Sequence, residues 1–70
     1  MDKTLKIQLN GESREITAGT TIADLLSDLQ LDDRALAVER NLQLVPRSEH
    51  VDALLAEGDR LEVVTLVGGG

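Results

Sequence analysis

Apolar residues occupy every second position at the start of the chain, at Leu5, Ile7 and Leu9. A period of two predicts a half-buried strand over residues 4–10. The strand runs into Asn10-Gly11, and both residues tolerate the positive φ that a tight hairpin turn requires. Residues 13–17 then predict a return strand in which Ile16 faces inward, so the chain opens with a β-hairpin.

The spacing of the apolar residues changes to that of a helix after residue 20. Thr21 is a good N-cap, and Asp24 has the position of its partner in a capping box. The apolar residues that follow lie at i, i+3, i+4 and i+7, namely Ile22, Leu25, Leu26 and Leu29. This stripe predicts a helix that ends near Gln30 and packs on the apolar face of the hairpin.

The second half of the chain predicts three more strands. Residues 36–38 indicate a strand, Arg40-Asn41 a turn, and residues 42–45 a short strand. Glu57-Gly58-Asp59 indicates another turn. The β-branched run over residues 60–67 then predicts the last strand.

A short helical turn is predicted before the last strand. Pro46 ends the preceding strand because it lacks an amide donor, and Ser48 can cap the turn that follows. The apolar residues of this turn are Val51, Leu54 and Leu55. For the chain as a whole, we expect one core formed by Leu5, Ile7, Ile22, Leu25, Leu26, Leu29, Val38, Leu61 and Val63.

The elements follow the order strand, strand, helix, strand, strand, strand, which predicts the α+β class. This order resembles the ubiquitin-like β-grasp. The resemblance implies a mixed sheet of about five strands around one main helix, with a short helical turn and the last strand beside the first. We expect one domain over residues 1–67 and a flexible glycine tail over residues 68–70.

The composition of the 70 residues excludes several classes of function. Thirteen acidic residues against seven basic ones give a formal net charge of −6, and Phe, Tyr and Trp are absent. Nucleic-acid binders need a basic surface or aromatic stacking platforms, so we expect no nucleic-acid partner. The absence of cysteine excludes disulfides and thiol catalysis. Because the first residues contain no long apolar run, we expect a cytoplasmic protein with no membrane partner.

Side chains that could perform catalysis are scarce. His50 is the one histidine, and in the polar segment Ser48-Glu49-His50 we expect it to be solvated rather than to act as a general base. The acidic residues are scattered, without the ordered spacing of a calcium loop, so we expect no metal site. The sequence therefore predicts that the chain is not an enzyme.

Three glycines, Gly68, Gly69 and Gly70, follow the apolar last strand. Glycine has no side chain, so such a tail can thread the active-site channel of another protein and present its carboxylate there. A carboxylate is a poor electrophile and needs activation, for example as an acyl-adenylate, by machinery that a chain of this size cannot hold. The sequence favours a carrier whose own C-terminus is the substrate. The alternative is a frayed chain end.

Three segments carry a family resemblance: AVERNLQLVPR at residues 37–47, EGDRLEVV at residues 57–64 and VGGG at residues 67–70. Together they resemble the ThiS family, the sulfur carrier proteins of thiamine biosynthesis. The resemblance implies that a ubiquitin-activating-type adenylyltransferase uses ATP to adenylate the carboxylate of Gly70. Sulfur from a cysteine desulfurase then converts it to a thiocarboxylate, and thiazole synthase accepts that sulfur. The carrier itself would bind no cofactor.

The sequence leaves three alternatives open. The small subunit of molybdopterin synthase, or another β-grasp sulfur carrier, would share the fold, the glycine end and the thiocarboxylate chemistry. A protein modifier would instead form isopeptide bonds with lysines. A non-reactive ubiquitin-like interaction module would keep its function without Gly69 and Gly70.

The last strand also predicts a docking surface for these partners. If Leu61 faces the helix, strand alternation places Glu62, Val64 and Leu66 on the outer face of the sheet. Leu42 or Leu44 from the preceding hairpin could join them. Clustered exposed apolar residues usually mark a partner site, and Glu62 would steer a basic partner. The alternative is an ordinary scatter of apolar residues on the surface.

Overall fold

The computed structural model describes residues 3–66, which form five strands, one α-helix and two short 3-10 helices. The strands are β1 (Thr4–Leu9), β2 (Glu12–Thr17), β3 (Leu36–Arg40), β4 (Gln43–Val45) and β5 (Arg60–Thr65). The helices are α1 (Ile22–Asp28), η1 (Asp33–Ala35) and η2 (Arg47–Glu49).

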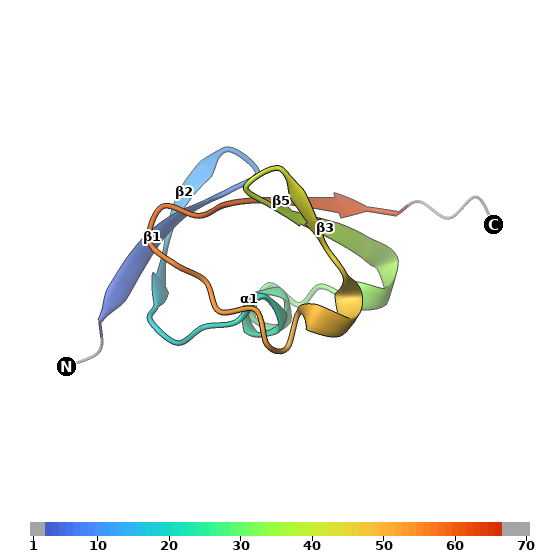
Figure 1. Cartoon of the computed structure of the whole chain (residues 1–70), viewed down its shortest axis with the longest axis horizontal. Helices are drawn as coiled ribbons and strands as arrows, with labels where there is room; N and C mark the ends of the chain where they lie inside the picture. Colours follow the sequence, from blue (N-terminus) through green and yellow to red (C-terminus); the bar gives the residue numbers. More distant parts are fainter. Residues whose placement is uncertain (1–2, 67–70) are drawn as a thin grey trace.

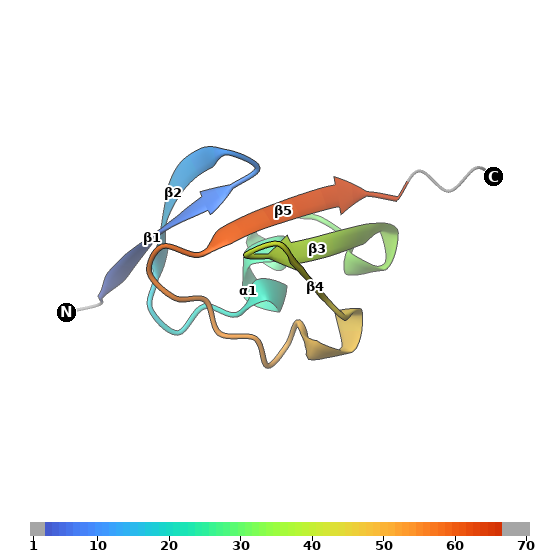
Figure 2. The ribbon, with the colours of Figure 1, turned by 45° about the horizontal axis from the view of Figure 1, so that its top comes forward.

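β5 lies in the middle of the sheet, although it is the last strand along the chain. The strand order is β2-β1-β5-β3-β4, with β5 parallel to β1 and antiparallel to β3. Figure 2 shows β5 between these two neighbours, and Figure 1 shows the sheet curving over α1. The predicted mixed sheet, with one main helix and the last strand beside the first, is confirmed.

The first hairpin closes through the predicted turn. Asn10 and Gly11 have φ values of +50° and +84°, the left-handed values that a type I′ turn needs. β2 begins at Glu12, one residue before the predicted start, and Ile16 faces the core as expected.

The predicted capping box begins α1. The Thr21 hydroxyl accepts a hydrogen bond from the Asp24 amide, and the Asp24 carboxylate accepts one from the Thr21 amide, each at 3.1 Å. The helix ends at Asp28, two residues before the predicted end. Leu29 is the C-cap, and Gln30 takes a left-handed φ of +59° that a helix cannot continue.

The segment that follows β4 differs from the predicted helical turn. A 3-10 helix covers only Arg47–Glu49, with Pro46 at its N-cap, so Ser48 lies inside the helix and does not cap it. Residues 53–55 run beside the start of α1 instead: the Ile22 amide donates to Ala53, and the Leu55 amide donates to Thr20. These backbone bonds hold the segment extended. Of the three apolar residues predicted there, Leu55 is buried, whereas Val51 and Leu54 are exposed.

The second hairpin turn lies one residue later than predicted. Asn41 and Leu42 both have positive φ, at +52° and +71°, so they form the two central residues of the turn. β4 therefore begins at Gln43, and Pro46 follows its last residue as expected.

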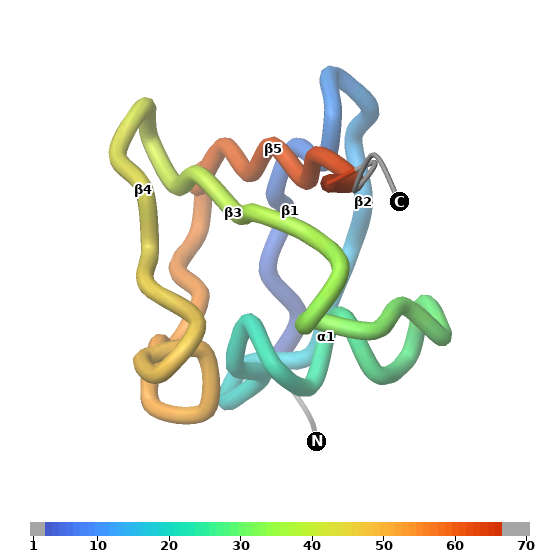
Figure 3. The backbone as a smooth tube through the Cα atoms, turned by 90° about the vertical axis from the view of Figure 1, so that its right-hand side faces the viewer, coloured from blue at the N-terminus to red at the C-terminus, as the bar shows by residue number. Residues whose placement is uncertain are grey.

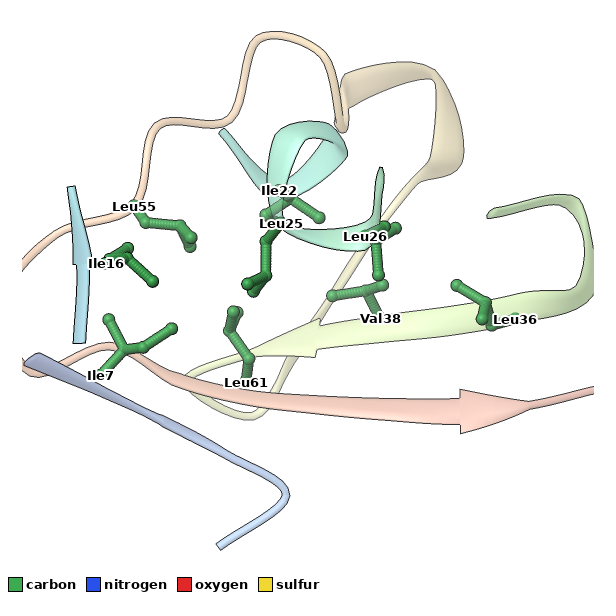
Figure 4. Packing of buried hydrophobic residues seen from close by; sticks show 9 residues of the cluster. All are labelled: Ile7, Ile16, Ile22, Leu25, Leu26, Leu36, Val38, Leu55 and Leu61. Carbon is green, nitrogen blue, oxygen red and sulfur yellow. The ribbon is translucent and has the colours of Figure 1, made fainter. Parts of the chain in front are cut away.

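The core lies between the sheet and α1 (Figure 4). Its nine buried members are Ile7, Ile16, Ile22, Leu25, Leu26, Leu36, Val38, Leu55 and Leu61. Three residues predicted to be buried, Leu5, Leu29 and Val63, pack against this cluster but are only half-buried. Ile16, Leu36 and Leu55 are buried members that the predicted core did not include, although Ile16 was expected to face inward.

Asn10 binds one edge of β5 with its side chain. The Asn10 Oδ1 atom accepts a hydrogen bond from the Val63 amide at 2.8 Å, and its Nδ2 group donates to the Val63 carbonyl at 3.3 Å. Since β1 ends at Leu9, this side-chain amide takes the place of a further backbone residue in the β1–β5 ladder.

Asn41 holds the other edge of β5. Its backbone amide donates to the Arg60 carbonyl at 2.8 Å, and its Oδ1 atom accepts from the Arg60 amide at 3.0 Å. Asn41 Nδ2 also donates to the buried carboxylate of Asp59. That carboxylate forms an ion pair with the Arg40 guanidinium and accepts a hydrogen bond from the Ala56 amide, each at 2.8 Å. Two turn asparagines therefore fix β5 between its neighbours.

Replacing Leu26 by alanine tests the core. Leu26 is buried in the centre of the interface between helix and sheet, so Leu26→Ala should reduce the free energy of unfolding by about 2–5 kcal/mol through lost burial and a residual cavity. Urea denaturation followed by far-ultraviolet circular dichroism suits a chain without aromatic residues. The exposed Leu54 provides the control, because Leu54→Ala should change stability little. An unchanged urea midpoint for Leu26→Ala would mean that another helix face is buried.

Replacing Asn10 tests how β5 is held. Asn10→Ala should lower the free energy of unfolding by about 1–3 kcal/mol, because it loses two hydrogen bonds and places alanine at positive φ. Asn10→Gly should cost less, because glycine adopts that φ freely. In both variants the Val63 amide should exchange faster with deuterium. Gln30, which has a similar φ of +59°, gives the control: Gln30→Ala should leave Val63 exchange unchanged.

Candidate functional site

The predicted tail site, Gly68 to Gly70, lies outside the described residues, as does Val67. The structure does show where the described chain leaves the sheet. β5 ends at Thr65, and the Leu66 amide donates to the Ala35 carbonyl at 2.7 Å. The central strand therefore delivers the chain to one end of the sheet, beyond the buried core (Figure 2).

The residues predicted to form the docking surface are all exposed: Leu42, Leu44, Glu62, Val64 and Leu66. Cross-strand register brings two of them into one row, because Leu44 pairs with Glu39 and Glu39 pairs with Glu62. Val64 lies two residues along β5, opposite Ala37. Side chains of β3, β4 and β5 therefore meet on the sheet face that points away from α1.

Leu42 lies apart from that row, at the tip of the second hairpin. Figure 3 shows the two hairpin turns on either side of β5. A hollow of about 190 Å³ lies between them, lined by Gln8, Gly11, Glu39, Leu42, Arg60, Leu61 and Glu62. The Arg60 side chain donates to Gln8 across it at 3.5 Å. The structure thus brings Leu42 and Glu62 to the same hollow.

Glu39 is the surface residue that the sequence analysis missed. Strand alternation contained the signal: because Leu36 and Val38 are buried, the residues between and after them point outward. Its position opposite Glu62 depends on the β3–β5 register, which neither strand reveals alone.

His50 is buried, with 1% of its surface exposed, so the prediction of a solvated histidine was wrong. Its Nε2 atom lies 3.1 Å from the Val45 carbonyl oxygen, and its backbone carbonyl accepts a hydrogen bond from the Ala23 amide. The 3-10 helix η2 turns the chain inward at this point. His50 therefore links the end of β4 to the start of α1, and within residues 3–66 its Nδ1 atom has no hydrogen-bond partner.

The charged groups elsewhere in the described part of the chain form no further site. Over residues 3–66, no three histidine, cysteine or acidic side chains gather as metal ligands. The Arg34 guanidinium lowers the pKa of Asp32 by hydrogen bonding to its carboxylate, on an exposed loop. The described helix α1 is far too short to cross a membrane.

Comparison with known proteins identifies the family. The sequence profile of the ThiS family matches residues 7–70. The sulfur carrier protein ThiS of Bacillus subtilis is 37% identical over 65 residues, which cover 91% of this chain and 98% of that protein. The two chains therefore correspond along almost their entire lengths.

A longer relative contains a similar segment. A thiazole synthase of Paramagnetospirillum magneticum is 44% identical over 66 residues, which cover 94% of this chain but only 20% of the relative. The chain thus spans about a fifth of that protein's length. In this relative, the segment similar to the chain is part of a longer polypeptide that is named thiazole synthase.

The fold also has a solved counterpart, the thiamine biosynthesis protein ThiS from Geobacter metallireducens. The two structures superpose with a TM-score of 0.79 over 94% of this chain and all of that chain, at 24% sequence identity. This likeness confirms the predicted β-grasp. Together, the profile match and the near full-length Bacillus relative show that the chain belongs to the ThiS family.

Proposed function

We propose that the chain is a sulfur carrier protein of thiamine biosynthesis and not itself an enzyme. The carboxylate of Gly70 carries the sulfur, at the end of a tail formed by residues 68–70 beyond a domain of residues 1–67. One observation supports this most directly. β5 is fixed on both edges by the turn asparagines and delivers the chain to the end of the sheet at Leu66, beside exposed apolar residues. A rigid strand leading to a narrow glycine segment is well suited to present a terminal group to an enzyme.

The chemistry assigned to this group requires partner enzymes. A carboxylate becomes reactive when an adenylyltransferase of the ubiquitin-activating type transfers AMP from ATP to it and releases pyrophosphate. A cysteine desulfurase supplies sulfur as a persulfide, which attacks the acyl-adenylate and expels AMP. A thiol reductant then cleaves the resulting acyl disulfide and leaves the thiocarboxylate. The carrier binds no cofactor of its own in this scheme, since ATP is bound by the partner. We place these reactions in the cytoplasm.

We propose thiazole synthase as the protein that accepts the sulfur. The Paramagnetospirillum thiazole synthase contains a segment similar to this chain. Joining two proteins in one polypeptide raises the local concentration of each for the other. That arrangement supports a direct encounter between carrier and synthase.

We further propose that both enzymes dock on the outer surface formed by Leu42, Leu44, Glu62, Val64 and Leu66. Four of these residues are large, exposed apolar side chains, and they follow β5 from the hairpin tip beside its start, at Leu42, to the residue after its end, at Leu66. Clustered exposed apolar residues of this kind usually mark a partner site. The acidic Glu62 among them and the net charge of −6 favour a basic partner and an association rate that falls with salt.

Changing the chain end tests the carrier chemistry. Deleting Gly70, or adding one residue after it, should abolish ATP–pyrophosphate exchange by the adenylyltransferase, because the reactive carboxylate is displaced. An added N-terminal residue is the control and should leave exchange intact. Intact mass analysis of protein from its native cells should reveal a fraction with sulfur in place of one oxygen. Undiminished exchange with the extended tail would reject the carrier chemistry.

Replacing Leu66 by aspartate tests the docking surface. Leu66→Asp should weaken both adenylation and thiazole formation about tenfold or more, by placing a charge in an apolar contact, while the melting temperature stays close to that of the parent. Val51→Asp is the matched control, because Val51 is similarly exposed (66% against 56%) but follows η2, away from β5. Normal rates for Leu66→Asp with both enzymes would show that docking occurs elsewhere.

A further inference from the structure

We propose that the partner places one basic side chain between Glu39 and Glu62 and receives Leu42 in an adjoining apolar pocket. This inference rests on the proposed function, since it assumes that a partner covers the outer surface. It adds the chemistry of that partner: an arginine or lysine beside an apolar recess.

The first observation is a pair of like charges. Glu39 and Glu62 are directly opposite each other on β3 and β5, and like charges at such positions destabilise a sheet. Both line the hollow between the hairpins. Among the residues that the structure describes, the ion pairs are Arg34–Asp32 and Arg40–Asp59, so neither glutamate is neutralised by one. Arg60 lines the same hollow, but its hydrogen bond goes to Gln8.

The second observation is the conformation of Leu42. Leucine at a φ of +71° is sterically strained, and the equivalent position of the first hairpin holds Gly11, with a φ of +84° and no such strain. Leu42 is also 83% exposed, so its side chain contributes little to the core. A strained apolar residue that the fold does not need is a candidate for a function outside the fold.

The surroundings of the two glutamates determine what can cover them. Leu44 lies beside Glu39 in the cross-strand row, and exposed Val64 lies two residues beyond Glu62. A partner that buries these apolar side chains also removes water from both carboxylates. Burying two unpaired charges is strongly unfavourable, whereas a cation between them offsets the loss of hydration. An uncharged apolar surface is therefore a poor partner for this face.

The same argument disfavours a second copy of the chain. A symmetric dimer through this face would bring four carboxylates together, and the cation that lines the hollow, Arg60, already contacts Gln8. A guanidinium suits the site best, because its several donors can bind two carboxylates at once.

The proposal predicts opposite effects on stability and on binding. Glu39→Gln, Glu62→Gln and the double variant should each raise the urea midpoint of the free carrier, because like-charge repulsion is removed. The same variants should weaken binding to the adenylyltransferase or thiazole synthase by about ten- to a hundredfold, measured by calorimetry at low salt. Leu42→Gly should likewise raise the midpoint and weaken binding. Glu49→Gln removes the same charge from the exposed η2 and should change affinity less than about twofold.

The outcomes separate this inference from the proposed function. If the parent carrier binds the enzymes and the glutamine variants bind equally well, the partner cation is rejected while the carrier function stands. Equal losses for Glu49→Gln would assign the effect to overall charge and would also reject the inference. If the free carrier self-associates and Glu62→Gln strengthens that self-association, the occupant of this face is a second copy of the chain and the inference is rejected. Failure of the parent carrier to bind either enzyme would reject both proposals.

Discussion

The sheet depends on the insertion of β5 between two strands that are far from each other in sequence. β5 forms a short parallel ladder with β1 and a longer antiparallel ladder with β3. Its residue Leu61 is buried in the core between the sheet and α1. Without β5, the first hairpin and the β3–β4 pair would be two separate ribbons, each too small to be stable alone. Asn10 and Asn41 secure this insertion from opposite edges. The same strand that completes the core therefore positions the exit of the chain and the outer surface beside it.

Most of the fold could be predicted because its determinants are local. The Asn10-Gly11 turn, the Thr21–Asp24 capping box and the apolar stripe of α1 each lie within a few residues. The errors occur where distant segments decide the structure. Residues 53–55 are held extended by backbone bonds to residues 20–22, and His50 is buried because η2 turns it toward the body of the domain. A polar sequence such as Ser48-Glu49-His50 contains no sign of either contact.

The candidate site, like the fold, could be predicted where its determinants are local and not where they depend on distant segments. The glycine tail could be recognised from the three consecutive glycines in the sequence. Membership of the ThiS family is the basis for the chemistry proposed for it. The exposed positions of β5 followed from simple alternation. The pairing of Glu39 with Glu62, by contrast, requires the β3–β5 register, and the strain at Leu42 requires the exact place of the turn. Features of this kind oppose local stability, so propensity rules do not anticipate them.

The parallel arrangement of β1 and β5 has a mechanical consequence. In parallel neighbours, the start of one strand and the end of the other lie at opposite ends of the sheet, as Figure 1 shows for β1 and β5. A force along β5 toward its end would load the hydrogen bonds to β1 and β3 in shear, so that they must yield together instead of opening one by one. An enzyme that grips and pulls the end of this strand would meet high resistance, and the domain would move as a rigid body before it unravelled.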